Sequence, residues 1–171
     1  VRRHLISDVP LGVFLSGGVD SSAIVAMMSR MMPAEKIRTF CIGFKEDSFD
    51  ESSHARRVAE HFGTDHNEQI LDADMMLDIL PGVWRLMDEP LADASIIPTH
   101  LLSRFTREYV TVALGGDGGD ELFCGYDPFL AHKLVPSCKY IPGWLHRGVV
   151  EPLIRRLPVS DSNMSLDFRL K

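Results

Sequence analysis

Two short glycine-rich stretches hold the residues whose types and spacing could do chemistry. The first, SGGVDSS at residues 16–22, follows a short apolar run and precedes an apolar helical pattern. Glycines let the backbone approach a ligand closely, and a loop that opens a helix presents free N–H groups to an anion. The stretch has neither the lysine of GxxxxGK[ST] nor the spacing of GxGxxG. It predicts a phosphate site of another kind, or, more plainly, an ordinary turn from strand to helix.

Asp20 stands in this first loop where a lysine would be expected. A carboxylate beside a bound phosphate is repelled unless a cation lies between the two groups. Mg²⁺ prefers oxygen ligands and commonly bridges carboxylates to phosphate oxygens. We therefore expect Asp20 to hold the metal of a magnesium nucleotide, while backbone N–H groups and the hydroxyls of Ser16, Ser21 and Ser22 hold phosphate.

The second stretch, GGDGGDE at residues 115–121, also follows an apolar run. It lacks the spaced ligands and the distal glutamate of a DxDxDG calcium loop. If both loops meet at one edge of a sheet, Asp20 and Asp120 can share a metal. A phosphate loop that faces an acidic loop is an arrangement suited to magnesium triphosphate.

The elements that must position these loops alternate along the chain. Strands are predicted at 12–15, 37–44, 66–71 and 109–114, and helices at 21–32, from an Asp50 N-cap to Gly63, and at 73–87 and 96–107. This alternation predicts an α/β fold, a parallel sheet with helices on both faces, and ligands bind such sheets beyond the carboxyl ends of the strands. Residues 1–129 form the predicted core. Residues 130–171, broken by prolines, are predicted to be an irregular helical extension.

Composition narrows the classes of function. With 45% hydrophobic and 25% charged residues among 171, the chain can bury a core, and its net charge of −6 without a basic block argues against nucleic acid. No apolar run has the length of a membrane span, and three cysteines without CxxC spacing favour a reducing compartment, the cytoplasm. His54, His61 and His66 are predicted to be surface histidines rather than zinc ligands, and the oligomeric state stays open, a homodimer included.

SGGVDSS resembles the pyrophosphatase loop of the N-type ATP pyrophosphatases, which cleave ATP between its α and β phosphates. Roughly residues 2–129 are similar to the synthetase domain of the glutamine-hydrolysing asparagine synthetases, and SLDFRLK is compatible with it. The resemblance implies an adenine nucleotide alpha hydrolase-like fold. It is carried by four blocks: DVPLGVFLSGGVDSSAIVAMM, TFCIGFKEDSFDESSHARRVAEHFGTDH, DEPLADASIIPTHLLSR and VTVALGGDGGDELFCGY.

This family uses ATP to convert a carboxylate into an acyl-adenylate with release of pyrophosphate, and ammonia then forms the amide. The resemblance implies ATP and Mg²⁺ as ligands and a small carboxylate, aspartate by default, as substrate. Leu15 and Ile42 would flank the nucleoside, and Gly115 and Gly116 would lie against ribose and adenine. The residues that would bind the β,γ-pyrophosphate are Ser16, Gly17, Gly18, Asp20, Ser21 and Ser22, with Asp20 on magnesium.

The resemblance also implies catalytic positions. Asp117 occupies the acidic position tied to adenylate formation, where many members have Glu. Asp120 would be a second metal ligand or a carboxylate at the reaction centre, and Tyr126 would lie near the acceptor site. Asp93 is a substrate-side candidate, with a loop that caps the next helix as its plainer interpretation.

Several departures from the family pattern limit this interpretation. Gly115 replaces a usual serine, and Cys124 replaces a usual glycine. The chain starts at Val1 instead of the catalytic cysteine of the family's glutaminase, so we expect that domain to be missing from this chain. The family's adenylation lysine would lie beyond Lys171, which predicts a fragment.

Three other functions stay open. Related enzymes of this pattern make other amides, in surface-polymer and β-lactam pathways. A nucleotide-binding module without turnover is a second alternative. The third, a tRNA-modifying sulfurtransferase with Cys124 as sulfur carrier, is opposed by the missing CxxC, the acidic charge and the DGGDE block.

Overall fold

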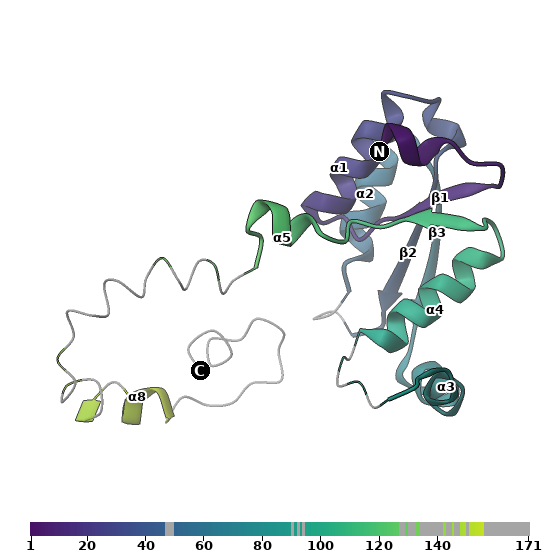
Figure 1. The fold of residues 1–171 in the computed structure, drawn as a ribbon. Helices are drawn as coiled ribbons and strands as arrows, with labels where there is room; N and C mark the ends of the chain where they lie inside the picture. The colour runs from purple at the N-terminus through teal and green to yellow at the C-terminus, as the bar shows by residue number, and fades with distance from the viewer. Residues whose placement is uncertain are drawn as a thin grey trace. The chain divides into compact units, whose positions relative to one another are not determined.

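The computed structural model describes residues 1–46, 50–89, 91, 93, 95–126, 129, 133, 142, 145, 148–149 and 151–155 (Figure 1). The chain divides into two compact units, Val1–Asp117 and Gly118–Lys171. The predicted extension over 130–171 falls largely outside the described residues, so the boundary at residue 129 stays a prediction.

The first unit is built on a four-stranded parallel sheet with the order β3-β2-β1-β4. Val13 in β1 lies beside Thr39 of β2 on one side and Leu114 of β4 on the other. The strands are β1 (Leu11–Phe14), β2 (Arg38–Phe44), β3 (Asp65–Leu71) and β4 (Val112–Leu114). The predicted parallel α/β fold is therefore confirmed.

Helices connect these strands in the predicted places. In the first unit they are α1 (Val19–Ser29), α2 (Ser52–Phe62), α3 (Ala73–Leu86) and α4 (Ile96–Arg107), with 3₁₀ turns η1 (Arg2–Leu5) and η2 (Ala34–Lys36). The described part of the second unit contains α5 (Gly119–Phe123) and α8 (Glu151–Arg155).

Neighbouring residues of β2 show that helices cover both faces of the sheet. The Cys41 side chain joins a buried cluster with Val25 of α1 and Ala55 of α2. Phe40 points the opposite way, and its ring lies 6.0 Å from that of Phe105 in α4. Figure 1 accordingly shows α1 and α2 on one side of the strands and α4 on the other. This is the expected result of side chains that alternate across a pleated strand.

Several element ends differ from prediction by one to three residues, and three of these differences have a local reason. Helix α1 ends at Ser29, where the Met31 N–H bonds to the Met28 carbonyl three residues back instead of four and the last turn tightens. Strand β4 begins only at Val112, since the N–H of Val110 bonds to Thr106 at the end of α4. Helix α2 begins at Ser52 with Glu51 as its N-cap, so the predicted N-cap Asp50 lies one residue too early; its carboxylate accepts the Ser52 N–H from there.

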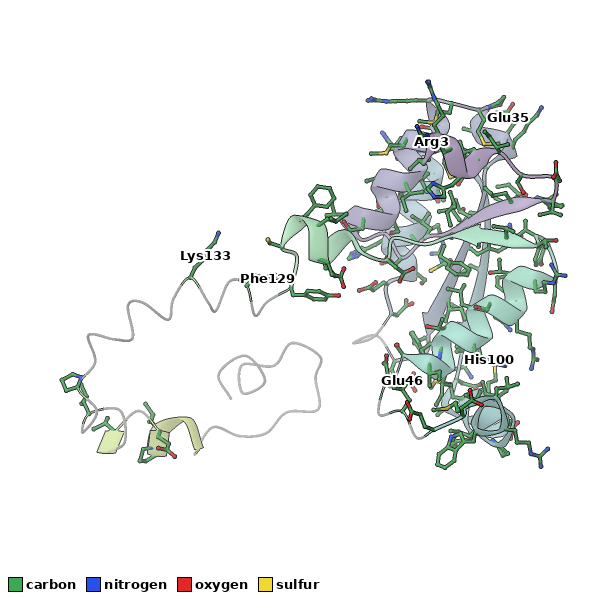
Figure 2. The ribbon with its side chains drawn as sticks, in the orientation of Figure 1. Arg3, Glu35, Glu46, His100, Phe129 and Lys133 are labelled. Atoms are coloured by element: carbon green, nitrogen blue, oxygen red, sulfur yellow. The ribbon has the colours of Figure 1, made fainter. Side chains whose placement is uncertain are left out.

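The carboxyl end of the sheet is the edge at which the glycine loops lie. Glu46 follows β2 at this edge, whereas Arg3 and Glu35, on turns that precede β1 and β2, lie at the opposite end of the first unit (Figure 2). Within the described residues, no helix combines the length and the apolar character that a bilayer crossing requires.

Candidate functional site

The first glycine loop leaves the carboxyl end of β1 and enters α1 at Val19, with Gly18 at the N-cap. Its own serines hold it in shape. Ser16 Oγ accepts the Gly18 N–H at 3.2 Å and lies 3.1 Å from Ser21 Oγ, which in turn donates to the Gly18 carbonyl at 3.2 Å. The first N–H groups of a helix have no intrahelical partner, so this loop offers donors to an anion.

Gly17 fits its position only as glycine. Its φ is +83°, in the left-handed region, and a Cβ at this position would lie 2.5 Å from both Ala55 N and His54 C. The loop therefore packs directly against the first turn of α2. No sequence motif pointed to His54 or Ala55 as neighbours of the loop.

The second glycine loop meets the first. A Cβ on Gly116 would lie 3.1 Å from Ser21 N and 3.2 Å from Asp20 Cβ, at the first turn of α1. The two loops come together because β1 and β4 are neighbours in the sheet and end at the same edge. The structure thus brings SGGVDSS and the start of GGDGGDE into one place.

Two carboxylates at this place carry no hydrogen bond or ion pair to the described residues: Asp20, which is half-buried, and Asp117, which is exposed. The Ser22 hydroxyl oxygen is buried and also has no hydrogen-bond partner within the described part of the chain. Unpaired carboxylate and hydroxyl oxygens fit a hard cation and a phosphate group. Among the described residues, no three His, Cys, Asp or Glu side chains gather into a ready metal site.

The remaining predicted residues of the first unit lie around the sheet. The Leu15 side chain is 1% exposed and belongs to the core, so only its backbone is available to a ligand. Ile42 is half-buried in β2. Asp93 accepts the Ser95 N–H at 2.9 Å just before α4, and hydrogen bonds from Ser95 lower the pKa of this exposed carboxyl.

Asp120 and Tyr126 belong to the second unit. The Tyr126 hydroxyl donates a 2.6 Å hydrogen bond to Glu121 Oε1, and this bond lowers the pKa of the Glu121 carboxyl. Cys124 ends α5 in the left-handed region, with φ +60°. Asp20 is in the first unit, so the sharing of a metal by Asp20 and Asp120 stays a prediction.

Comparison with known protein families identifies the family to which this chain belongs. The asparagine synthase family model matches residues 1–167. The chain belongs to the asparagine synthase family. It is 40% identical over 145 residues to a putative glutamine-hydrolysing asparagine synthetase 2 of Methanocaldococcus jannaschii, covering 85% of this chain and 28% of that protein. It is 35% identical over 147 residues to glutamine-hydrolysing asparagine synthetase 1 of Bacillus subtilis, covering 86% and 23%.

A match to a putative glutamine-hydrolysing asparagine synthetase of Mycobacterium tuberculosis, 37% identical, covers 87% of this chain and 22% of that protein. The chain thus spans 22 to 28% of the length of these family members. Among solved structures it is similar to the glutamine-dependent NAD⁺ synthetase of Acinetobacter baumannii in complex with ADP. The TM-score is 0.50 at 19% identity, over 70% of this chain and 24% of that one. This likeness supports the shared fold.

Proposed function

We propose that this chain carries the ATP-dependent step of an amide-forming ligase. A small carboxylate, aspartate by default, attacks the α-phosphate of ATP to give an acyl-adenylate and pyrophosphate, and ammonia then attacks the acyl carbon to form the amide and release AMP. The observation that carries the proposal is the contact of Gly116 with Asp20 and Ser21, which joins a phosphate-type loop to an acidic one. Membership of the asparagine synthase family supports the same reaction class.

The first loop would hold the pyrophosphate part of ATP. The loop N–H groups and the hydroxyls of Ser16, Ser21 and Ser22 would bind it; Ser21 would exchange its bond to the Gly18 carbonyl for one to phosphate, and Ser22 has no other partner among the described residues. Asp20 would hold magnesium, which neutralises charge on the pyrophosphate. The Leu15 backbone and Ile42 would flank the nucleoside, with Gly115 and Gly116 against ribose and adenine.

Catalysis in this proposal is mainly positioning and charge stabilisation. Asp117 would act at the adenylate, and Asp120 would serve as a second metal ligand or as a carboxylate at the reaction centre. Tyr126 and Asp93 would lie on the acceptor side. Two free cysteines among the described residues, Cys41 and Cys124, support a reducing compartment, the cytoplasm, as the location.

The test is pyrophosphate release by the protein with ATP, Mg²⁺, ammonia and a panel of carboxylates that includes aspartate. Release should depend on one carboxylate and should fall about a hundredfold in Asp20→Asn, because the metal loses a charged ligand. Asp8→Asn is the matched control, since Asp8 is an exposed carboxylate outside both loops.

Release that is absent with every carboxylate would refute the ligase activity. Calorimetry with ATP and Mg²⁺ then separates the alternatives. Binding without release would identify a nucleotide-binding module, whereas no binding would remove the nucleotide site as well.

A further inference from the structure

The first glycine loop, residues 16–22 and called the nucleotide loop from here on, is supported by residues outside its own motif. Gly17 lies flush against the first turn of α2, with no space for even one added carbon between the Gly17 backbone and the backbone of His54 and Ala55. Ala55 is fully buried there. The position of the loop therefore depends on where α2 begins.

Asp50 determines where α2 begins. Its Oδ1 accepts the N–H of Phe44, the last residue of β2, at 3.2 Å and the N–H of Ser52, the first residue of α2, at 3.1 Å. Its Oδ2 accepts the Ser52 hydroxyl at 2.9 Å, and Ser52 is only 4% exposed. One carboxylate thus ties the carboxyl end of a central strand to the start of the helix behind the loop.

The charged form of Asp50 suits this role. Burial alone would raise the pKa of this carboxyl, but the hydrogen bonds from Ser52 and Phe44 outweigh burial and lower it. Hydrogen bonds to an ionised acceptor are shorter and stronger than those to a neutral one. Ionised Asp50 thus links β2 to α2 through three hydrogen bonds of 2.9–3.2 Å.

We propose that Asp50 is a positioning residue for the nucleotide loop: through Ser52 and the first turn of α2, its carboxylate holds Gly17 and the loop N–H groups in their anion-binding arrangement. The proposal rests on the proposed function for its ligand, a nucleoside triphosphate. Its mechanical part, that the loop loses order when the carboxylate is lost, does not depend on any ligand.

The test compares Asp50→Ala with Asp72→Ala. Asp72 is a matched control because it also caps a helix, α3, by accepting the Met75 N–H at 2.9 Å, and also binds a second group, Lys45 Nζ at 3.0 Å. The atoms nearest to a Cβ on Gly17 or Gly18 come from α2 and from the loop itself, and none comes from α3. Both variants lose a cap, but only one loses the support of the loop.

Hydrogen exchange is measured first, without nucleotide, on the amides of residues 16–22. Asp50→Ala should raise their exchange rate about tenfold, the equivalent of one lost charge-assisted hydrogen bond, and Asp72→Ala should leave it unchanged. Asp50→Asn should give an exchange rate between those of wild type and Asp50→Ala, because the Asn oxygen still accepts both N–H groups but carries no charge. Equal exchange in the two alanine variants would overturn the proposal.

The affinity for ATP with Mg²⁺ is measured next by calorimetry. The dissociation constant should rise about tenfold in Asp50→Ala and stay within about twofold of wild type in Asp72→Ala. An unchanged affinity in Asp50→Ala would overturn the proposed role in binding. If the wild-type protein itself does not bind ATP, the proposed function fails, while the exchange data still decide whether Asp50 positions the loop.

A milder variant keeps the test valid if Asp50→Ala does not fold. Ser52→Ala removes only the hydroxyl that donates to Asp50 Oδ2 and leaves both N–H bonds in place. It should speed exchange of the loop amides about threefold, with no change in the amides of α3. Unchanged exchange in the loop would again count against the proposal.

Discussion

Replacement of Gly17 by alanine is a direct test of how the loop is built. The left-handed φ of +83° costs a residue with a Cβ about 1–2 kcal/mol relative to glycine. The new carbon would also lie 2.5 Å from two backbone atoms of α2, and backbone cannot rotate away as a side chain can. Forcing a methyl group into a packed site costs about 1–3 kcal/mol. Gly17→Ala should therefore lose about 2–5 kcal/mol of unfolding free energy.

Gly63→Ala is the matched control for this variant. Gly63 has a similar φ of +70° at the end of α2, but a Cβ there meets nothing within 4 Å. Gly63→Ala should lose only the conformational part of the unfolding free energy, about 1–2 kcal/mol. Urea unfolding of wild type and both variants gives the two differences, and calorimetry with ATP shows whether the remaining folded Gly17→Ala protein has lost affinity.

One result of comparing Gly17→Ala with Gly63→Ala would contradict the steric contact between the loop and α2. If the two alanine variants lose the same free energy within about 0.5 kcal/mol, then no steric contact exists between the loop and α2. That result would also remove the basis for Asp50 as a positioning residue. A larger loss in Gly17→Ala with unchanged ATP affinity would keep the contact but contradict the assignment of this loop to the nucleotide.

Three further predictions concern stability and reactivity. Gly82→Ala, inside α3 with nothing within 4 Å of the added carbon, should stabilise the protein by about 1 kcal/mol in urea unfolding. Burial lowers the pKa of His66, whose Nδ1 lies 2.8 Å from the Thr39 hydroxyl. The unfolded chain therefore binds the proton more readily than the folded protein, and the free energy of unfolding should fall as the pH drops below about 6.5. His66→Asn should flatten that fall. Burial raises the pKa of Cys41 to about 12, so alkylation with peptide mapping should modify exposed Cys124 and leave Cys41 intact until the protein unfolds.

The fold of the first unit could be predicted because its elements follow local rules. Alternating apolar runs and helical periodicity placed all of β1 to β4 and α1 to α4 in the right order. The ends of the helices and strands were less predictable, since they depend on which carbonyl accepts a given N–H group. Val110, for example, extends an apolar run in the sequence, yet its N–H caps α4 rather than joining β4.

Burial of single polar residues was harder to predict. His66 was predicted to lie on the surface, and this is wrong: its side chain is only 13% exposed. The reason is register, because β3 places His66 beside Thr39, which is fully buried in β2. The register between strands is set by the whole sheet, so the residues next to His66 in the sequence do not indicate that its side chain is buried.

The candidate site was predictable in its parts and not in its contacts. Each glycine loop is visible as a motif, and the rule that ligands bind at the carboxyl ends of parallel strands places both at one edge. Their meeting depends on β1 and β4 being neighbours, although about a hundred residues separate them. The contact of Gly17 with α2 follows from packing alone, and no residue type at His54 or Ala55 indicates it.

Gly115 and Asp117 of the second loop are linked by geometry. The resemblance described above implies a usual serine at position 115 and, in many members, a glutamate at position 117. In the structure the Asp117 carboxylate folds back into the space that a side chain on Gly115 would occupy. A residue with a Cβ at position 115 would force this carboxylate outward, so the glycine permits a conformation in which the shorter acid lies over its own loop. The absence of a side chain at position 115 therefore provides the space in which the Asp117 carboxylate lies.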